Sequence, residues 1–342
     1  MPTSTSYRRC LPALVLVASL AGCAGNQASS GGFVPQSAAP SGLPASDAST
    51  QMAGAVQPDS KVHIFTANRD SGDVLAFLAS ASGNVAPSRK IGGSKTTLSQ
   101  PDALAMDASG AIYAANDGGT QVAVFASDAN GNVKPQRIIG GSKSQLGPTE
   151  GLMVAPSGNL WASDYGNNAV TEYAAGAQGN VAPISAIGGS KTHLSTPVGM
   201  AMDSNSRVFV ANANGASVVA FASGANGNVA PVVTIAGSNT GLSRPFALAF
   251  DSHGRLLVAD EGAGVFVFAK GANGNVAPLA KITGISYPTG VVADGHDHIY
   301  VADFTGNSIK EFASNANGNA TPLRSITGSN TGLSGANYLV LH

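Results

Sequence analysis

Short apolar runs bounded by turn residues recur along residues 61–342. Several of them end in an aspartate, at residues 103–107, 199–203, 247–251 and 290–294. Other runs, such as residues 218–221 and 255–259, are apolar almost throughout, with little alternation between apolar and polar positions. Runs of this length predict β-strands, and their unbroken apolar character predicts sheets that are covered on both faces.

A Gly-Asn-x-x-Pro signature repeats along the same region. Its prolines, which lie 44 to 48 residues apart, are Pro87, Pro135, Pro183, Pro231, Pro278 and Pro322. The short runs of each repeat predict one sheet of four strands. Asn-Gly pairs such as Asn130-Gly131 predict type I′ hairpins between the third and fourth strands, in which both central residues need a positive φ.

A repeated unit of this size cannot bury its own apolar sheet faces, so it has to pack against a copy of itself. An open stack of such units would need polar caps, and the sequence shows none. Residues 338–342 instead look like a lone first strand, and residues 62–66 look like a second strand without its first. We therefore predict an all-β, six-bladed β-propeller over residues 60–342, closed by pairing of the C-terminal strand with the N-terminal strands of the domain.

The units resemble NHL-type propeller repeats. The resemblance is clearest in Pro-Val-Gly-Met-Ala-Met-Asp at residues 197–203, Val-Phe-Val-Ala-Asn at 208–212 and Val-Val-Ala-Phe at 218–221, and it covers residues 61–342. It implies the propeller fold. Because NHL-type propellers serve as binding platforms, scaffolds and occasionally enzymes, the resemblance does not imply one function.

The N-terminus has the features of an export signal. Arg8 and Arg9 precede an apolar stretch at residues 11–20 that is too short for a comfortable membrane span. The stretch leads into Leu-Ala-Gly-Cys, which resembles the lipobox of bacterial lipoproteins. We expect residues 1–22 to be a lipoprotein signal peptide and Cys23 to carry the lipid.

Residues 23–59 are rich in Ser, Gly, Ala and Pro and carry almost no charge. Such a segment cannot bury enough apolar surface to fold, so it predicts a flexible tether. Ala24 follows the lipidated cysteine, and a residue other than Asp there implies sorting to the outer membrane in the lipoprotein families of Gram-negative bacteria. We expect an exported protein that contacts the membrane through its lipid anchor only.

Composition narrows the choice of function. The chain of 342 residues has a formal net charge of -1, and 11% of its residues are charged. This balance gives no electrostatic reason to expect a nucleic-acid partner. The two cysteines, Cys10 and Cys23, both lie near the N-terminus. A disulfide framework, a cysteine zinc site and a cysteine nucleophile in the body of the protein are therefore not expected.

The first candidate site is a ring of side chains at the central channel. Each repeat contributes one of them, at the end of its second strand. Propeller hydrolases of the gluconolactonase type, which this fold resembles, place metal-ligating Asp and Asn near the channel. Asx side chains also bond their own backbone at strand-ending turns, and a residue found in every repeat favours such a structural role. The ring consists of Asn68, Asn116, Asp164, Asn212, Asp260 and Asp303.

The second candidate site breaks the repeat. At the position that leads into the first strand, ring order places Asp102, Glu150 and Asn337 on adjacent blades. Two carboxylates and an amide at one channel mouth suit a divalent cation such as Ca²⁺, and Val198 and Phe246 would supply an apolar wall opposite. The alternative is that these are separate, solvated loop residues.

Two functions follow from these patterns. The regular ring favours a non-catalytic ligand- or protein-binding or scaffold propeller, whose partner is an envelope protein, peptidoglycan or a glycan. The alternative is a metal-dependent, lactonase-like hydrolase or lyase at the channel mouth, with the cation on Asp102, Glu150 and Asn337. The propeller also resembles virginiamycin B lyase, but the histidines here do not repeat at one radial position, so that resemblance does not extend to the catalytic histidines.

Overall fold

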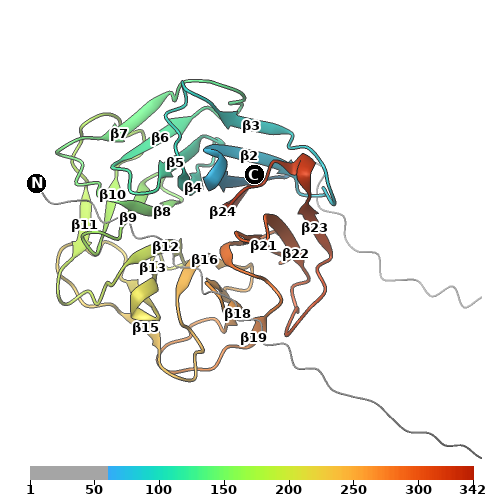
Figure 1. Cartoon of the computed structure of the whole chain (residues 1–342). Helices are drawn as coiled ribbons and strands as arrows, with labels where there is room; N and C mark the ends of the chain where they lie inside the picture. Colours follow the sequence, from blue (N-terminus) through green and yellow to red (C-terminus); the bar gives the residue numbers. More distant parts are fainter. Residues whose placement is uncertain (1–60) are drawn as a thin grey trace, which may run out of the picture. The chain divides into compact units, whose positions relative to one another are not determined.

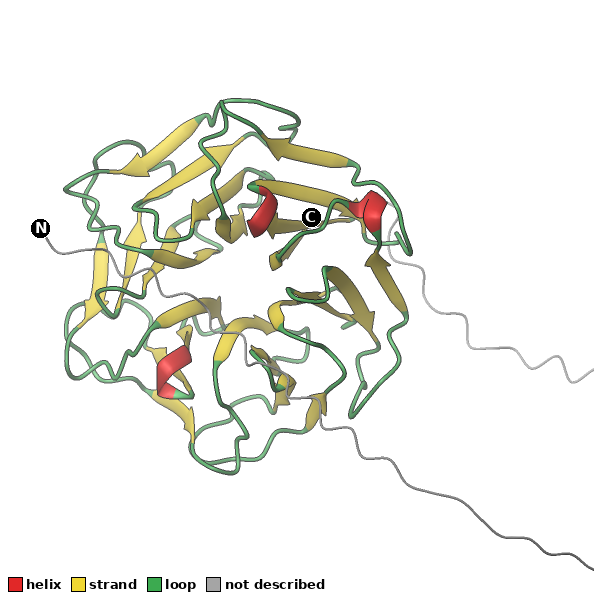
Figure 2. Cartoon of the chain, in the orientation of Figure 1, coloured by secondary structure: helices red, strands yellow, loops and turns green. Residues whose placement is uncertain are grey.

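The computed structural model describes residues 61–342, and the predicted signal peptide, lipidated cysteine and tether lie outside them. The described chain forms 24 strands and three single-turn 3-10 helices (Figure 2). The strands make six antiparallel sheets of four strands, which stand around a common axis as blades (Figure 1). The prediction of an all-β, six-bladed propeller is confirmed.

We number the blades in chain order and give their strands from the axis outward. Blade 1 contains β24 (Ala336–Leu341), β1 (His63–Asn68), β2 (Asp73–Leu78) and β3 (Arg89–Gly92). Blade 2 contains β4 (Pro101–Met106), β5 (Ile112–Asn116), β6 (Gln121–Phe125) and β7 (Arg137–Gly140). Blade 3 contains β8 (Thr149–Val154), β9 (Leu160–Asp164), β10 (Ala169–Tyr173) and β11 (Ser185–Gly188).

The other three blades follow the same plan. Blade 4 contains β12 (Pro197–Met202), β13 (Val208–Asn212), β14 (Ser217–Phe221) and β15 (Val233–Ala236). Blade 5 contains β16 (Pro245–Phe250), β17 (Leu256–Asp260), β18 (Gly264–Phe268) and β19 (Ala280–Ile282). Blade 6 contains β20 (Pro288–Ala293), β21 (Ile299–Asp303), β22 (Ser308–Phe312) and β23 (Arg324–Thr327). The 3-10 helices are η1 (Arg69–Ser71), η2 (Ala213–Gly215) and η3 (Ser329–Thr331).

The ring closes by strand pairing, as predicted. The C-terminal strand β24 pairs antiparallel with β1, with Ile64 opposite Leu341 and Asn68 opposite Ala336. The ladder extends past the strand end, where the His63 N–H donates to the His342 carbonyl at 2.7 Å. The first strands of neighbouring blades also contact one another all the way around the axis. The two ends of the described chain therefore share one sheet.

The Gly-Asn-x-x-Pro signature joins each blade to the one before it. Gly131 pairs in parallel with Ile91 of blade 1, and the same Gly–Ile bridge occurs at all six interfaces. Beside it, the Asn132 Oδ1 atom accepts the Lys95 N–H at 2.7 Å. The signature is therefore an inter-blade contact.

The type I′ prediction for these segments was wrong. Gly131 has φ 78°, but Asn130 is not among the residues with positive φ. Its Oδ1 atom instead accepts the Lys90 N–H of the preceding blade at 3.1 Å. The connection from β6 to β7 is a long excursion to a neighbouring blade, and that long-range contact overrides the local turn preference of an Asn-Gly pair.

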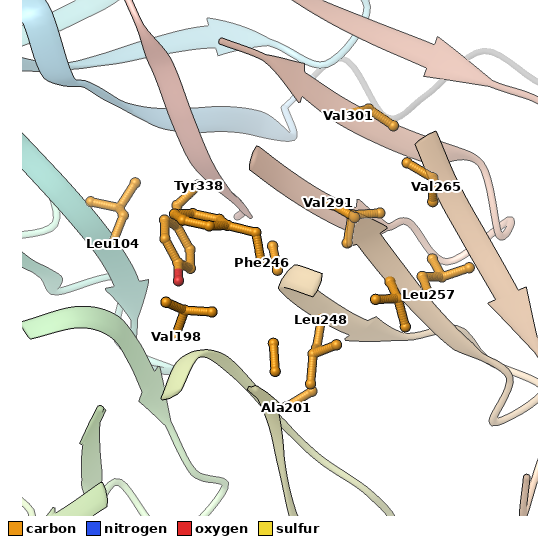
Figure 3. Close-up of a cluster of buried hydrophobic side chains, with 14 of the residues drawn as sticks. Leu104, Val198, Ala201, Phe246, Leu248, Leu257, Val265, Val291, Val301 and Tyr338 are labelled. Atoms are coloured by element: carbon orange, nitrogen blue, oxygen red, sulfur yellow. The ribbon is translucent and has the colours of Figure 1, made fainter. Parts of the chain in front are cut away.

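Apolar side chains fill the centre of the ring. Phe246 and Tyr338 come from blades 5 and 1, and their ring centroids lie 5.5 Å apart. Figure 3 shows them with Leu104 and Val198 where the first strands converge. Burying a side chain of this size contributes about 1.5–3 kcal/mol. Gly199 lets the first strands approach, because a Cβ atom there would clash with the Phe246 carbonyl.

Candidate functional site at the upper mouth

We call the end of the propeller where the second strands end and the first strands begin the upper face. The predicted ring of Asn and Asp residues lies at this end, and its side chains bond to loop backbone. Asn116, for example, accepts the Ser99 N–H at 2.8 Å and donates to the Thr97 carbonyl at 2.9 Å. Asp260 likewise accepts the Ser243 N–H at 2.8 Å. These bonds hold the connection that enters each blade against the end of its second strand.

Blade 3 departs from this arrangement. Asp164 accepts the N–H groups of Gly166 and Asn167, at 2.9 and 3.0 Å, in its own turn. Gly147 stands in the connection where Ser99 stands in blade 2, and a Cβ atom there would clash with the Asp164 carboxylate. In blade 6, Lys310 lies 2.7 Å from Asp303. The ring residues therefore each have partners of their own, and they do not form one common ligand set.

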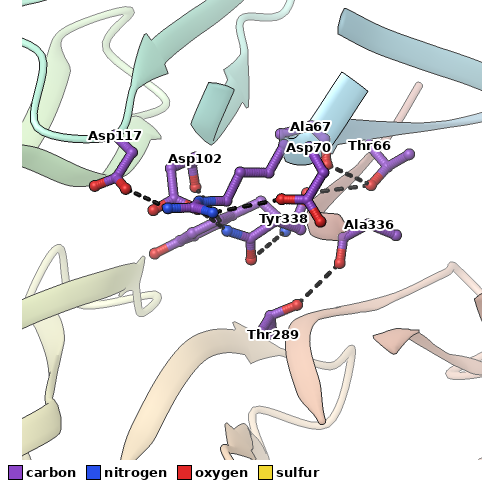
Figure 4. Close-up of polar contacts among 10 residues, drawn as sticks. Thr66, Ala67, Asp70, Asp102, Asp117, Thr289, Ala336 and Tyr338 are labelled. Carbon is purple, nitrogen blue, oxygen red and sulfur yellow. Dashed lines mark hydrogen bonds and ion pairs between the residues drawn. The ribbon is translucent and has the colours of Figure 1, made fainter. Parts of the chain in front are cut away.

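The structure brings together two of the residues predicted to lead into the first strands. Asp102 and Asn337 are fully buried, and the Asn337 Nδ2 atom donates to the Asp102 carboxylate. The Nε atom of Arg69, from η1, lies 3.5 Å from the same carboxylate (Figure 4). Asp102 is therefore paired with a guanidinium and an amide donor.

Arg69 was not foreseen from the sequence. Its guanidinium also pairs with Asp117 on the neighbouring blade and lies 3.4 Å from Asp70 (Figure 4). Arg69 and Asp117 occupy the same position, the first residue after the ring residue of each blade. The signal that could have revealed them is the loss of the repeat at this position, which reads Arg69, Asp117, Tyr165, Ala213, Glu261 and Phe304.

Tyr165 locates Glu150, the third predicted residue. Burial, and after it the negative charges of Asp117, Glu150, Asp102 and Asp164, raise the pKa of Tyr165 to about 12. Glu150 lies in β8, which contacts β4, the strand of Asp102. The Tyr165 phenol stays protonated at neutral pH, so it can donate a hydrogen bond and is a poor general base. We call Arg69, Asp102, Asp117, Glu150 and Tyr165 the upper mouth.

A second polar group lies across the axis on blades 5 and 6. The Glu261 carboxylate is buried, accepts the Tyr287 hydroxyl at 2.6 Å and pairs with Arg244 at 2.8 Å. Tyr287 also contacts Phe304 edge to face, with ring centroids 6.1 Å apart. This side of the upper face therefore combines a fixed ion pair with two aromatic rings.

The residues expected to form an apolar wall are buried beneath the mouth. Val198 is 1% exposed and Phe246 is 0% exposed. Thr289, at the equivalent position of blade 6, donates to the Ala336 carbonyl at 3.0 Å (Figure 4). These side chains fill the axis, so they form a floor and not a wall that a ligand could touch.

The contacts of Asp102 do not fit a Ca²⁺ site. A hard cation is held by oxygen ligands, whereas Asn337 presents its amide nitrogen to the carboxylate. The Asn337 Oδ1 atom already accepts the Tyr338 N–H at 3.2 Å. Arg69 supplies the positive charge that a cation would otherwise bring. A metal ion here would have to displace both partners.

The lower face holds one group of metal-type side chains. In the part of the chain that the structure describes, Asp251, His253 and Asp297 are the one set of three whose ligand atoms lie within 4.8 Å of one another. Asp251 already pairs with Arg255, and Asp297 accepts the N–H and hydroxyl of Ser252 at 2.8 and 2.9 Å. Burial alone would raise the pKa of Asp297, but these bonds and His253 have the larger effect and hold the pKa below its usual value. The three side chains form a contact between blades 5 and 6.

These features define a six-bladed propeller with a polar upper mouth, and comparisons support the fold. No protein-family model matches the chain, and no curated protein does. A nidogen/laminin complex matches at 13% identity with a TM-score of 0.59, over 82% of this chain and 98% of that chain. A protein of unknown function from Bacteroides caccae matches at 11% identity and 0.58, also over 82% and 98%. A streptogramin B lyase matches at 14% identity and 0.50, over 67% and 70%.

At such identities these similarities show the propeller fold and nothing about activity. Their diversity agrees with this, since a nidogen/laminin complex and a streptogramin B lyase both appear among them. Within residues 61–342, no helix has the length and apolar character to cross a membrane.

Proposed function

We propose that this chain is a non-catalytic, NHL-like binding propeller whose upper face takes a glycan of the cell envelope. The observation that carries the proposal is the set of partly exposed aromatic rings on that face, Tyr165, Tyr287 and Phe304, beside fixed polar groups such as Asp117 and Arg244. Aromatic faces pack against the apolar faces of sugar rings, while carboxylates and guanidinium groups bond their hydroxyls.

The polar contacts of the mouth support binding over metal-dependent hydrolysis. The Asp102 carboxylate, which the hydrolase alternative needs as a ligand, is engaged by Arg69 and Asn337. The pKa of Tyr165 is raised to about 12, away from the neutral range that suits a general base. Paired groups of this kind are held in place before a ligand arrives, which lowers the entropy cost of binding.

The glycan proposal is tested with purified peptidoglycan sacculi. We expect the full-length protein in detergent to sediment with sacculi, and Tyr165→Ala and Phe304→Ala to weaken the apparent affinity about tenfold each, a loss of about 1.4 kcal/mol. Leu279→Ala, just before the outer strand β19 and 61% exposed, is the matched control and should bind as the wild type does.

Two results would count against this proposal. One is sedimentation that the aromatic substitutions leave unchanged. The other is a melting temperature that rises on addition of Ca²⁺ in the wild type but not in Asp102→Asn, since a ligand that binds the folded state stabilises it. The second result would favour the metal-dependent hydrolase.

We further propose that the propeller is exported and held on the outer membrane by a lipid on Cys23, which would bring it within reach of peptidoglycan. Multiple acyl chains anchor a protein far more firmly than a single chain does. The variant Cys23→Ser should move from the membrane fraction to the soluble fraction, whereas Cys10→Ser should stay on the membrane. Membrane retention of Cys23→Ser would contradict the proposed anchor.

A further inference from the structure

The large apolar side chains that are exposed in residues 61–342 all lie at the lower face. Neighbouring strands of a blade are antiparallel, so the third strands end and the fourth strands begin at this face. One of the exposed side chains ends the third strand of blade 1, and the other four each directly precede a fourth strand. They are Leu78, Ile184, Val232, Leu279 and Leu323. The exposed aliphatic surface is therefore concentrated at one end of the propeller.

Four of these side chains occupy one position of the repeat on the consecutive blades 3 to 6. Their backbone N–H groups donate to third-strand carbonyls at 2.7–2.8 Å, which sets them at the same height along the axis. Their side chains are 46–61% exposed. We call them the lower arc, which consists of Ile184, Val232, Leu279 and Leu323.

The fold does not require aliphatic side chains at this position. Blades 1 and 2 have Ser88 and Gln136 there, with the same backbone hydrogen bond. A single exposed aliphatic side chain is ordinary in a folded protein. In the lower arc, however, the residue changes between Ile, Val and Leu from blade to blade while its aliphatic character is kept. This favours a role at the surface over a role in packing.

The outer strands change from apolar to polar along the axis. In blade 3, β11 begins directly after Ile184, and Lys191 is exposed beyond its upper end. In blade 4, β15 leads in the same way from Val232 to the exposed Asn239. Surfaces with an apolar and a polar side lie where water meets the apolar part of a membrane. The direction of this change would place the lower face toward the membrane.

The described chain joins the propeller at the same end. β1 is the second strand of blade 1, so it begins at the lower face. Just before it, the Val62 carbonyl accepts the Ala79 N–H at 2.8 Å. The part of the sequence that contains Cys23 is therefore connected to the lower face. A lipid on Cys23 would tie this end of the propeller to a bilayer.

The arrangement of the lower arc suits a bilayer better than a protein partner. Its side chains lie one to a blade. A stable protein interface buries about 800 Å² of continuous surface on each partner, whereas a bilayer can take up separate side chains, with an affinity that grows with the apolar area buried.

We propose that the lower face rests on a lipid bilayer, with the side chains of the lower arc in the boundary between headgroups and acyl chains. This contact adds to the lipid anchor, which the sequence alone predicts as the sole contact with the membrane. It would leave the upper mouth pointing away from the membrane. The inference rests on the proposed anchor at Cys23 and does not involve glycan binding.

The test compares two tryptophans placed at opposite ends of β11 in the full-length, lipidated protein. Ile184→Trp lies in the lower arc, and Lys191→Trp is the matched control, since both positions are exposed. Each variant is reconstituted into vesicles of phosphatidylethanolamine and phosphatidylglycerol, with or without bromine near the top of the acyl chains. The wild type corrects for Trp161, which is 4% exposed.

Brominated lipid should lower the emission of Ile184→Trp about twofold and leave that of Lys191→Trp unchanged, because side chains at a membrane surface enter it by only about 5–10 Å. Adding Val232→Ser, Leu279→Ser and Leu323→Ser to Ile184→Trp should reduce this quenching. If circular dichroism shows that Ile184→Trp is unfolded, Leu279→Trp takes its place.

Flotation of the vesicles separates failure of the contact from failure of the anchor. Protein that floats with the vesicles but shows equal quenching at both positions, or stronger quenching at Lys191→Trp, would overturn the contact and leave the anchor standing. Quenching that the three serine substitutions leave unchanged would also overturn the role of the lower arc. Protein that does not float would contradict both the anchor and the contact.

Discussion

At the residue scale, the aspartate that follows a first strand organises the turn below it. The Asp203 Oδ1 atom accepts the N–H groups of Asn205 and Arg207 at 3.0 and 2.9 Å, and its Oδ2 atom pairs with the Arg207 side chain. Burial raises the pKa of Asp203, but these bonds outweigh burial and hold the pKa below its usual value. The same arrangement lowers the pKa of Asp107 in blade 2. One side chain thus fixes both a turn and the strand that follows it.

Replacing Asp203 should therefore cost stability in a pH-dependent way. A carboxyl whose pKa is depressed on folding stabilises the protein above its unfolded pKa, and that contribution is lost as pH falls through the folded pKa. Asp203→Ala should lower the free energy of unfolding at pH 7 by about 1.5–3 kcal/mol, the value of hydrogen bonds to a charged group. The difference from wild type should shrink below about pH 4. Urea unfolding at several pH values measures it.

The exposed aspartate Asp128 provides the control for this series. Asp128→Ala should change the free energy of unfolding by less than about 0.5 kcal/mol, as surface substitutions usually do. A destabilisation of Asp203→Ala that is equal at pH 7 and pH 3 would mean that packing, and not the charged hydrogen bonds, accounts for the effect.

At the element scale, local pattern was sufficient for the strands but not for the links between them. The runs at residues 218–221 and 255–259 fall within or beside β14 and β17. They could be predicted because a strand that is buried on both faces is apolar along its whole length. The Asn-Gly segments were misread because their partners lie in the preceding blade, as Asn130 and Lys90 show. The residue types of a turn do not show a hydrogen bond to a residue on another blade, far away in the sequence.

The inter-blade contact of the signature can be tested at one link. The Asn228 Oδ1 atom accepts the Lys191 N–H at 2.7 Å, so Asn228→Ala should remove that bond and destabilise the protein by about 1 kcal/mol. Hydrogen exchange of the Lys191 amide should become faster while the β14 amides keep their protection. Asn205→Ala, on an exposed turn, is the control, and Lys191 exchange that is the same in both variants would contradict the role given to Asn228.

At the scale of the whole molecule, ring order predicted the neighbours at the upper mouth, but the charges that neutralise them were not foreseen. Asp102 and Asn337 could be placed together because closure makes the chain's last strand adjacent to β4. Arg69 could not, since nothing in its local sequence shows that η1 turns toward another blade. In the structure, Asp102 of the predicted metal site is paired with Arg69 and Asn337. The fold could be predicted from the sequence repeat, whereas the partners of Asp102 depend on which side chains reach from one blade to the next.

Closure itself gives the last prediction. Deleting residues 336–342 removes β24, the Tyr338 ring beneath the mouth and the amide partner of Asp102. An open ring would expose the apolar faces of blades 1 and 6, so the truncated chain should lose cooperative thermal unfolding and near-ultraviolet circular dichroism.

A circular permutant, with residues 329–342 joined by a short turn ahead of residue 61, should fold normally, because His342 and His63 are already hydrogen bonded to each other. The permutant makes blade 1 continuous like its neighbours. A truncated chain that still melts cooperatively at the wild-type temperature would show that the ring does not need its shared blade, and a permutant that fails to fold would show that chain order matters beyond the pairing of β24 with β1.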